Sequence, residues 1–287
     1  MRGFGLVCLF GLFLLHSPSA QNIQISTDSE LDWQRGTIRV TITAEAAPGA
    51  NIRPEFIHRA RRRIDAEFPG ALFNALLPLN VDSVRIVREV VQAQPELASR
   101  ITNLAAQAKS GLPHPNPTAT ALERIFEVPI FPDFVRLFMN HEIPFRMEDV
   151  ISWVPTTDFT GIVIYAADPL PLRGTDKEVY PAPALLPELY DENLRPVLEQ
   201  DMVDPESGRR WGVVAYSAHT DEDPWRHRIG PRPLRIMARE VYGIHPTDLI
   251  IDEDDADLIL ASDHNRELLR TGRILVVLHP SQIRVID

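Results

Sequence analysis

The 287-residue sequence holds a single cysteine, Cys8, which lies inside an apolar N-terminal run. A lipid-anchored protein carries its cysteine after such a run, behind small residues, so the position of Cys8 argues against a lipid anchor. If the run is removed, the mature chain has no cysteine and forms no disulfide, thiolate metal site or cysteine nucleophile. The stability of the mature protein must then come from its hydrophobic core.

Lysine is scarce as well, because Lys109 and Lys177 are the only two and nearly all cations are arginine. The formal net charge is -11. Nucleic acids and anionic membrane surfaces both select clustered positive charge, which an acidic chain does not offer. We therefore expect no nucleic-acid partner.

The sequence signatures of common catalytic and nucleotide-binding sites are missing. The chain contains neither the G-x-S-x-G turn of a nucleophilic serine nor the G-x-G-x-x-G turn of a dinucleotide site, and it lacks a phosphate-binding loop. We assign no catalytic, cofactor-binding or metal-binding residue and expect no cofactor. The sequence thus predicts a protein that is not an enzyme.

The N-terminus has the three-part pattern of a secretory signal peptide. Arg2 supplies a positive charge, residues 4–15 are apolar, and residues 17–20 offer small side chains for cleavage. The apolar run is shorter than the roughly 20 residues of a membrane span. We predict a signal peptide at residues 1–20, export to the periplasm, and no transmembrane anchor in the mature chain.

Alternating and helical patterns fill the first half of the mature chain. Residues 36–44 alternate apolar and polar side chains, as a half-buried strand does. Residues 54–77 have helical spacing, which we expect Pro69 and Gly70 to kink or split. Further elements are predicted in order: a helix from residue 84 capped by residues 81–83, a helix at 96–109, a hinge loop between lobes at 111–117, a strand at 121–130 and a short helix at 133–139.

The second half is richer in short apolar runs. Residues 161–166 and 184–190 are predicted strands, and the proline-rich segment 168–183 between them is a predicted stiff surface loop. Other predictions are a turn at 202–208, strands at 212–216, 234–239, 249–251 and 274–278, a polar loop at 220–233, and a helix that begins after Asp252 and ends at Gly272. The fold class is α+β, with an N-terminal strand-helix domain at residues 21–155 and a mixed-sheet domain at residues 156–287.

Two acidic segments are candidate cation sites. The first, Asp252 to Asp257, lacks the glycine turn and distal glutamate of a calcium loop, and helix capping also explains it. The second holds His219, Asp221, Asp223 and His227, whose spacing matches neither a zinc-finger nor an H-E-x-x-H pattern. A mobile surface loop is the interpretation we favour for the second segment.

Several segments occur in an order that resembles a family. They are R-A-R-R-R-I-D-A with L-L-P-L-N-V-D-S, then T-G-I-V-I-Y-A, A-L-L-P-E-L-Y-D-E-N, V-D-P-E-S-G-R-R-W-G-V-V-A-Y-S, I-G-P-R-P-L, T-D-L-I-I-D-E-D-D-A and R-I-L-V-V-L. Together they look like exported bacterial proteins assigned to flagellar assembly protein T or a related outer-membrane lipoprotein family. The chain departs from that pattern at residues 165–168, which are Y-A-A-D in place of D-A-R-G, and it lacks a lipid-anchor cysteine.

The resemblance implies a periplasmic protein tied to the cell envelope or the flagellar basal body, and it carries no catalytic residues. We expect a non-enzymatic scaffold or adaptor that binds a protein partner through the loops at 168–183 and 220–233. The alternative is a periplasmic hydrolase or cation-dependent binding protein that uses the Asp/His-rich loop. That alternative requires the His219 loop to converge at ligand distance, whereas a scaffold should expose an apolar patch elsewhere.

Overall fold

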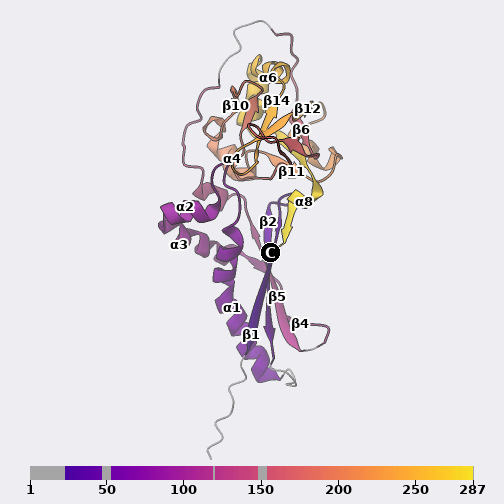
Figure 1. The fold of residues 1–287 in the computed structure, drawn as a ribbon. Coiled ribbons are helices and arrows are strands. Elements are labelled where there is room, and N and C mark those ends of the chain that lie inside the picture. The colour runs from indigo at the N-terminus through magenta and orange to yellow at the C-terminus, as the bar shows by residue number, and fades with distance from the viewer. Residues whose placement is uncertain (1–22, 47–52, 119, 148–153, 287) are drawn as a thin grey trace, which may run out of the picture.

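The computed structural model describes residues 23–46, 53–118, 120–147 and 154–286. The predicted signal peptide and its cleavage site lie outside these residues. Figure 1 shows an elongated molecule with a long sheet and helix at one end and a mixed assembly of short elements at the other. We call residues 23–147 the N-terminal unit and residues 154–283 the C-terminal unit. Among the described helices, none is long and apolar enough to cross a membrane.

An antiparallel sheet forms the centre of the N-terminal unit. Its long strands are β1 (Gln24–Asp32), β2 (Thr37–Glu45) and β5 (Ala121–Pro129), and its short strands are β3 (Lys109–Ser110), β4 (His114–Pro115) and β16 (Arg284–Ile286). The predicted alternation of β2 is confirmed, since Ile38, Val40 and Ile42 are buried while Arg39 and Thr41 are only half-buried. One face of the sheet therefore belongs to the core, and the other faces solvent.

Helix α1 (Pro54–Leu76) covers the buried face of this sheet, as Figure 1 shows. Of the kink or split predicted at Pro69 and Gly70, the split is wrong, because α1 runs through both residues. Its buried face continues on either side of the proline, and Phe68 stacks on Phe126 with the ring centroids 3.9 Å apart. Burial of that face offsets the helical hydrogen bond that a proline removes.

Helices α2 (Val87–Ala93) and α3 (Glu96–Asn103) and the 3-10 turn η1 (Leu104–Gln107) follow α1. The predicted cap at residues 81–83 is wrong, since α2 begins later. Asp82 instead accepts hydrogen bonds from the backbone N–H groups of Val84 and Arg85 at 3.0 and 2.7 Å, which makes a tight turn. The predicted hinge at 111–117 is also wrong, because β4 within it pairs with β5 and extends the sheet.

Two four-stranded sheets build the C-terminal unit. The first is parallel and contains β11 (Ala215–Ser217), β15 (Ile274–Leu278), β6 (Ile162–Ala166) and β12 (Leu234–Met237) in that order. The second is mixed and contains β10 (Pro196–Leu198), β9 (Leu189–Asp191), β14 (Asp248–Ile251) and β13 (Glu240–Tyr242). With the antiparallel sheet and its helix, this arrangement confirms the predicted α+β class.

Helices and a small hairpin surround these sheets. They are the 3-10 turns η2 (Val135–Leu137), η3 (Gln200–Met202) and η4 (Asp223–Trp225), the helices α4 (Pro205–Trp211), α5 (Arg226–Ile229), α6 (Glu253–Leu260), α7 (Asp263–Arg270) and α8 (Pro280–Ile283), and the hairpin of β7 (Leu170–Pro171) and β8 (Glu178–Val179). The predicted turn at 202–208 is wrong, since α4 begins there with the Asp204 side chain capping Ser207 N at 2.8 Å. The single helix predicted before Gly272 is two helices, and the strand predicted at 184–190 forms only from Leu189.

A buried arginine of α5 connects two turns of the C-terminal unit, one at the end of α4 and one after α7. Arg228 is 4% exposed and donates hydrogen bonds to the carbonyls of Gly272, Trp211 and Gly212 at 2.7, 2.7 and 2.9 Å. Its guanidinium also lies 5.0 Å from the centre of the Trp211 ring. Burial lowers the pKa of Arg228 to about 9, which still leaves it charged at neutral pH. Three carbonyl oxygens thus take the place of water molecules around the planar guanidinium.

Candidate interaction surface at the junction of the two units

Backbone hydrogen bonds join the two units directly. Leu185 N–H donates to Asn80 O at 3.0 Å, and Leu186 N–H donates to Val81 O at 2.8 Å. The side-chain amide of Asn80 donates to Pro183 O at 3.0 Å. Because these backbone groups are paired across the junction, the chain around residue 80 and the chain around residue 185 form one packed layer.

The ends of the chain add to the same contact. Strand β16 follows the C-terminal unit but pairs with β1 of the N-terminal sheet. Trp33, just after β1, packs edge-to-face on Tyr216 with ring centroids 5.5 Å apart. The Tyr216 hydroxyl both accepts from Ala184 N–H and donates to Ala184 O at 3.0 Å, and burial raises its pKa. One hydrophobic core therefore extends through both units.

A buried carboxylate lies at this junction. Asp248 is 1% exposed, and its Oδ1 accepts from Glu188 N–H at 3.0 Å and from the Thr247 hydroxyl at 3.3 Å. The Ser83 side chain of the N-terminal unit also hydrogen-bonds to it. Its other oxygen, Oδ2, has no partner among the described residues. Burial raises the pKa of Asp248 to about 7, and the charge of Glu188 contributes.

Two turns meet above this carboxylate. Gly243 has a φ of +115°, and a Cβ at that position would lie 2.4 Å from the Cβ of Ser83. His245 N–H donates to Ser83 O at 2.9 Å. The residues that follow each contact point, Val84 and Ile244, are 57% and 78% exposed. The close approach of the two turns thus fixes two exposed apolar side chains on adjoining loops.

A second exposed apolar pair belongs to the segment after η2. Ile143 is 83% exposed and Phe145 is 68% exposed, although Phe145 N–H is fixed to Asp201 O at 2.7 Å. Their segment and helix α7 line an open groove of about 420 Å³. Arg266 and Arg270 of α7 contribute charged side chains to it. The groove is therefore apolar on one wall and polar on the other.

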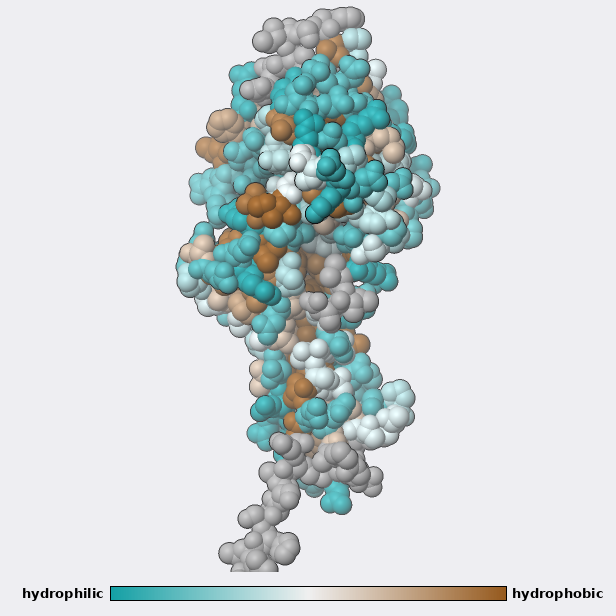
Figure 2. All heavy atoms as spheres, in the orientation of Figure 1, coloured by the Kyte–Doolittle hydropathy of each residue, from teal (hydrophilic) through white to brown (hydrophobic). Residues whose placement is uncertain are grey.

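A pocket of about 240 Å³ is lined by residues that neighbour each of these two apolar pairs. Arg85, which follows Val84, and Asp201, which holds Phe145, both line it. We call the group of exposed side chains made by Val84, Arg85, Ile143, Phe145 and Ile244 the junction surface. Figure 2 shows apolar atoms on the visible face at the level between α4 and α2, where the two units meet.

The Asp/His-rich loop does not form a site in the structure. His219, Asp221, Asp223 and His227 are all exposed, and their contacts are local: His227 Nδ1 lies 3.0 Å from Pro224 O, and Asp221 accepts from Asp223 N–H at 3.1 Å. Among the described residues, no three histidine, cysteine or acidic side chains are grouped so that they could hold a metal ion. The four residues are thus a solvated loop, within which η4 and α5 form.

Arginines pair with two carboxylates of the other acidic segment, Asp252 and Asp257. Asp252 precedes α6, but its side chain accepts from Arg239 Nε at 2.7 Å and makes no capping bond. Asp257 accepts from Arg195 at 2.6 Å, and the same arginine reaches the buried Asp191 at 2.8 Å. Two carboxylates of the segment are therefore held by arginines, one before α6 and one within it. Side-chain capping by Asp252 is not observed.

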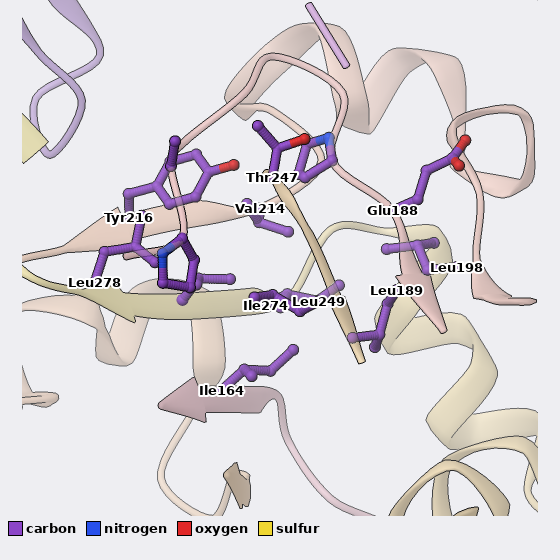
Figure 3. A pocket seen from close by; sticks show the side chains of 14 residues that line it. Ile164, Glu188, Leu189, Leu198, Val214, Tyr216, Thr247, Leu249, Ile274 and Leu278 are labelled. Atoms are coloured by element: carbon purple, nitrogen blue, oxygen red, sulfur yellow. The ribbon is translucent and has the colours of Figure 1, made fainter. Parts of the chain in front are cut away.

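The space between the two sheets of the C-terminal unit is too small for a substrate. Figure 3 shows Ile164, Leu189, Leu249 and Ile274 pointing into it, with Glu188 at its border. The enclosed volume is about 20 Å³, which is room for a single water molecule. This cavity belongs to the core, and the junction surface is the stronger candidate site.

Two family models match separate parts of the chain. Residues 24–137 match the family model of the N-terminal domain of Treponema pallidum Tp0624. Residues 161–280 match that of the second domain of the same protein. The chain is thus similar to two domains of an uncharacterised family. The Tp0624 matches do not support the specific resemblance to flagellar assembly protein T, and no curated protein matches the chain.

Sequence reasoning missed the junction surface, although weak signals for it exist. Ile143 and Phe145 flank a proline between the charged Glu142 and Arg146, where a buried segment is not expected. Ile244 follows a glycine in a turn. Of the two predicted contact loops, residues 168–183 pack on the body of the protein, since Arg173 N–H donates to Val241 O at 2.9 Å.

Proposed function

We propose that this protein is a non-enzymatic scaffold or adaptor of the bacterial cell envelope that binds a protein partner through the junction surface. The observation that carries this proposal is the exposure of Ile143, Phe145, Val84 and Ile244 at a rigid contact between the two units. Apolar side chains grouped beside polar ones are typical of protein interfaces.

Rigidity favours binding here. The turns that present Val84 and Ile244 are fixed by Ser83, and the backbone of Phe145 is fixed by Asp201. A partner therefore meets side chains whose backbone is already ordered, so less conformational entropy is lost on association. Arg85 lies at the border of the apolar groups and would contribute to a polar rim.

The cellular setting of the proposal comes from the sequence. The pattern of residues 1–20 supports export through a signal peptide, and the acidic, cysteine-free mature chain fits a periplasmic protein. Association with the flagellar basal body is a narrower form of the proposal. It rests on the sequence resemblance alone, so an envelope partner is the form we test.

Site-specific photo-crosslinking in cells tests the proposal. A photo-reactive amino acid replaces Ile244 in one variant and Met237 in another, because Met237 is 57% exposed on β12 and outside the junction surface. We expect the first position to crosslink a defined envelope protein, identified by mass spectrometry, and the second to crosslink little of it. In the Ile244 variant, the further change Phe145→Asp should reduce the crosslinked product about tenfold or more.

Equal crosslinking from both positions would show non-specific capture. A product from Ile244 that persists unchanged with Phe145→Asp would contradict binding by the junction surface as a whole. If neither position yields a protein product, the adaptor proposal fails. The circular dichroism spectrum of each variant checks that the fold is retained.

A further inference from the structure

The two edges of the N-terminal sheet differ in how much of their length is paired. On one edge, β3 and β4 each pair with a separate part of β5. On the other edge, β16 pairs with β1 only at Glu30, Leu31 and Asp32. Within the described part of the chain, residues 24–29 of β1 have no strand on their outer side. Six consecutive residues therefore form an open sheet edge.

Alternate residues of β1 direct their backbone groups to this open edge. Trp33, directly after β1, donates its N–H to Ile283 O at 3.0 Å on the β16 side. Successive residues of a strand point their N–H and C=O groups to opposite sides. Ile25, Thr27 and Ser29 therefore present donors and acceptors outward, whereas the even-numbered residues face β2.

The open edge lacks most of the features by which proteins protect such edges. Proline, lysine, bulges and short length are the usual means. Residues 24–29 are Q-I-S-T-D-S, and the register with β2 is continuous from Gln24 opposite Glu45 to Asp32 opposite Thr37. Asp28 is the only charge in the open segment. The backbone thus offers an uninterrupted template for an added strand.

The two faces beside the edge differ in chemistry. On the α1 face, Ile25, Thr27 and Ser29 continue the row of buried side chains on β2, and Ile25 packs against the core. The opposite, solvent face of β1, β2 and β5 is acidic. It carries one arginine, Arg39, and six carboxylates: Asp28, Glu30, Asp32, Glu45, Glu123 and Glu127.

Charge selects the kind of strand that fits. Arg39 pairs with Glu30 and Glu127, both at 2.9 Å. Within the described part of the chain, Asp28 has no hydrogen-bond or ion-pair partner. A basic side chain opposite Asp28 would gain a cross-strand pair, and like charges there would repel. A second copy of this chain, paired through its own β1, would bring two acidic faces together and is disfavoured.

We propose that the open edge of β1 binds an extended, basic segment of a partner protein as an additional antiparallel strand. Its side chains alternate between apolar residues on the α1 face and arginine or lysine on the acidic face. Strand β16 already runs antiparallel to β1 along this edge, so the added strand continues its direction beyond Glu30. The inference rests on the adaptor function and gives the adaptor a second contact surface.

A designed peptide tests the proposal directly on the full chain. The probe is a peptide of alternating arginine and valine, six residues long to match the open segment at residues 24–29. The control peptide has glutamate in place of arginine. We expect the arginine peptide to bind in a fluorescence anisotropy titration and the glutamate peptide not to bind. Hydrogen exchange should show fast amide exchange at Ile25, Thr27 and Ser29 in the free protein and protection when the peptide is bound.

Two proline variants separate edge binding from folding. Thr27→Pro removes an outward N–H that the described fold does not use, so it should leave the melting temperature nearly unchanged and weaken peptide binding about tenfold or more. Ser26→Pro removes an inward N–H that faces β2, so it should lower the melting temperature clearly. Asp28→Lys should weaken the arginine peptide about fivefold without loss of stability.

Each failure has a distinct meaning. No binding of the arginine peptide, or equal binding of both peptides, overturns the proposed chemistry. Protection of Ile25, Thr27 and Ser29 without peptide overturns the open edge. In ultracentrifugation, a dimer that Thr27→Pro dissociates would identify a second copy as the occupant and also overturn the proposal. The change Ile244→Asp should leave peptide binding intact, so loss of the junction contact and loss of the edge contact are measured separately.

Discussion

Arg228 and Asp248 are both buried charged side chains, but their surroundings differ. Arg228 lies inside the C-terminal unit and donates to three carbonyls. Asp248 lies where the two units meet, and one of its carboxylate oxygens has no partner among the described residues. Burial is tolerated in the first case because each guanidinium nitrogen donates to a carbonyl. In the second case burial leaves a cost in stability that depends on pH.

The largest expected effect comes from removing the satisfied charge. Arg228→Met should lower the free energy of unfolding by about 3–5 kcal/mol, because the carbonyls of Trp211, Gly212 and Gly272 lose their donors in a buried place. Arg226→Met is the matched control, since Arg226 pairs with Asp223 at an exposed site. Urea denaturation measures both. Similar small losses in the two variants would contradict the role given to Arg228.

Replacing Asp248, the other buried charge, should have a smaller effect on the free energy of unfolding, and of opposite sign. Folding raises the pKa of Asp248 from its ordinary value of 3.8 to about 7, so the folded state holds a proton that the unfolded state has lost between these values. Stability therefore falls as pH rises from about 4 to about 7. Asp248→Asn should remove this fall and raise the free energy of unfolding by about 1–3 kcal/mol at pH 8 relative to pH 5.

Thermal unfolding at several pH values checks this prediction. Asp28→Asn is the control, because Asp28 is an exposed carboxylate on β1 whose neutralisation should change stability little at either pH. A benefit of Asp248→Asn that is the same at pH 5 and pH 8 would show that charge burial is not its cause.

The smallest effect on stability is expected from Ser83, the residue of the N-terminal unit that hydrogen-bonds to Asp248. Ser83→Ala removes a donor to Asp248 and leaves the carboxylate with fewer partners. We expect a loss of about 1 kcal/mol at pH 8 and less at pH 5, because the missing hydrogen bond matters most when the carboxylate is charged. A pH-independent loss in a denaturation series would assign the effect of Ser83 to packing alone.

Parts of the fold with a regular side-chain pattern were predictable from the sequence. The alternation in β2 and the apolar runs of β6 and β15 reflect burial on one face and on both faces of a sheet, respectively. β1 was missed because most of its residues are polar, so that its sequence resembles a loop. Helix α4 was missed because Pro205 and Gly208 suggest a turn, whereas Pro205 is the first helical residue and Gly208 fits against Met139.

The junction surface was beyond sequence reasoning for a different reason. Ser83 and Gly243 lie far apart in the chain, and neither turn has a sequence feature that names the other. Their contact depends on Asp248 and the packed layer between the units. By contrast, the spacing of His219, Asp221, Asp223 and His227 along the chain was enough to predict a surface loop. The four residues are exposed in the structure.

Strand β16 has a consequence for how the protein is made. Its pairing joins Val285 to Leu31, so the edge of the N-terminal sheet is finished only after the whole C-terminal unit has been synthesised. Closing so long a loop carries an entropic cost that must be met before the pairing is gained. We expect β1, β2, β5 and α1 to assemble early and the β16 pairing to form last. A growing chain would therefore expose the entire outer edge of β1, and any chaperone that binds extended segments would find its site there.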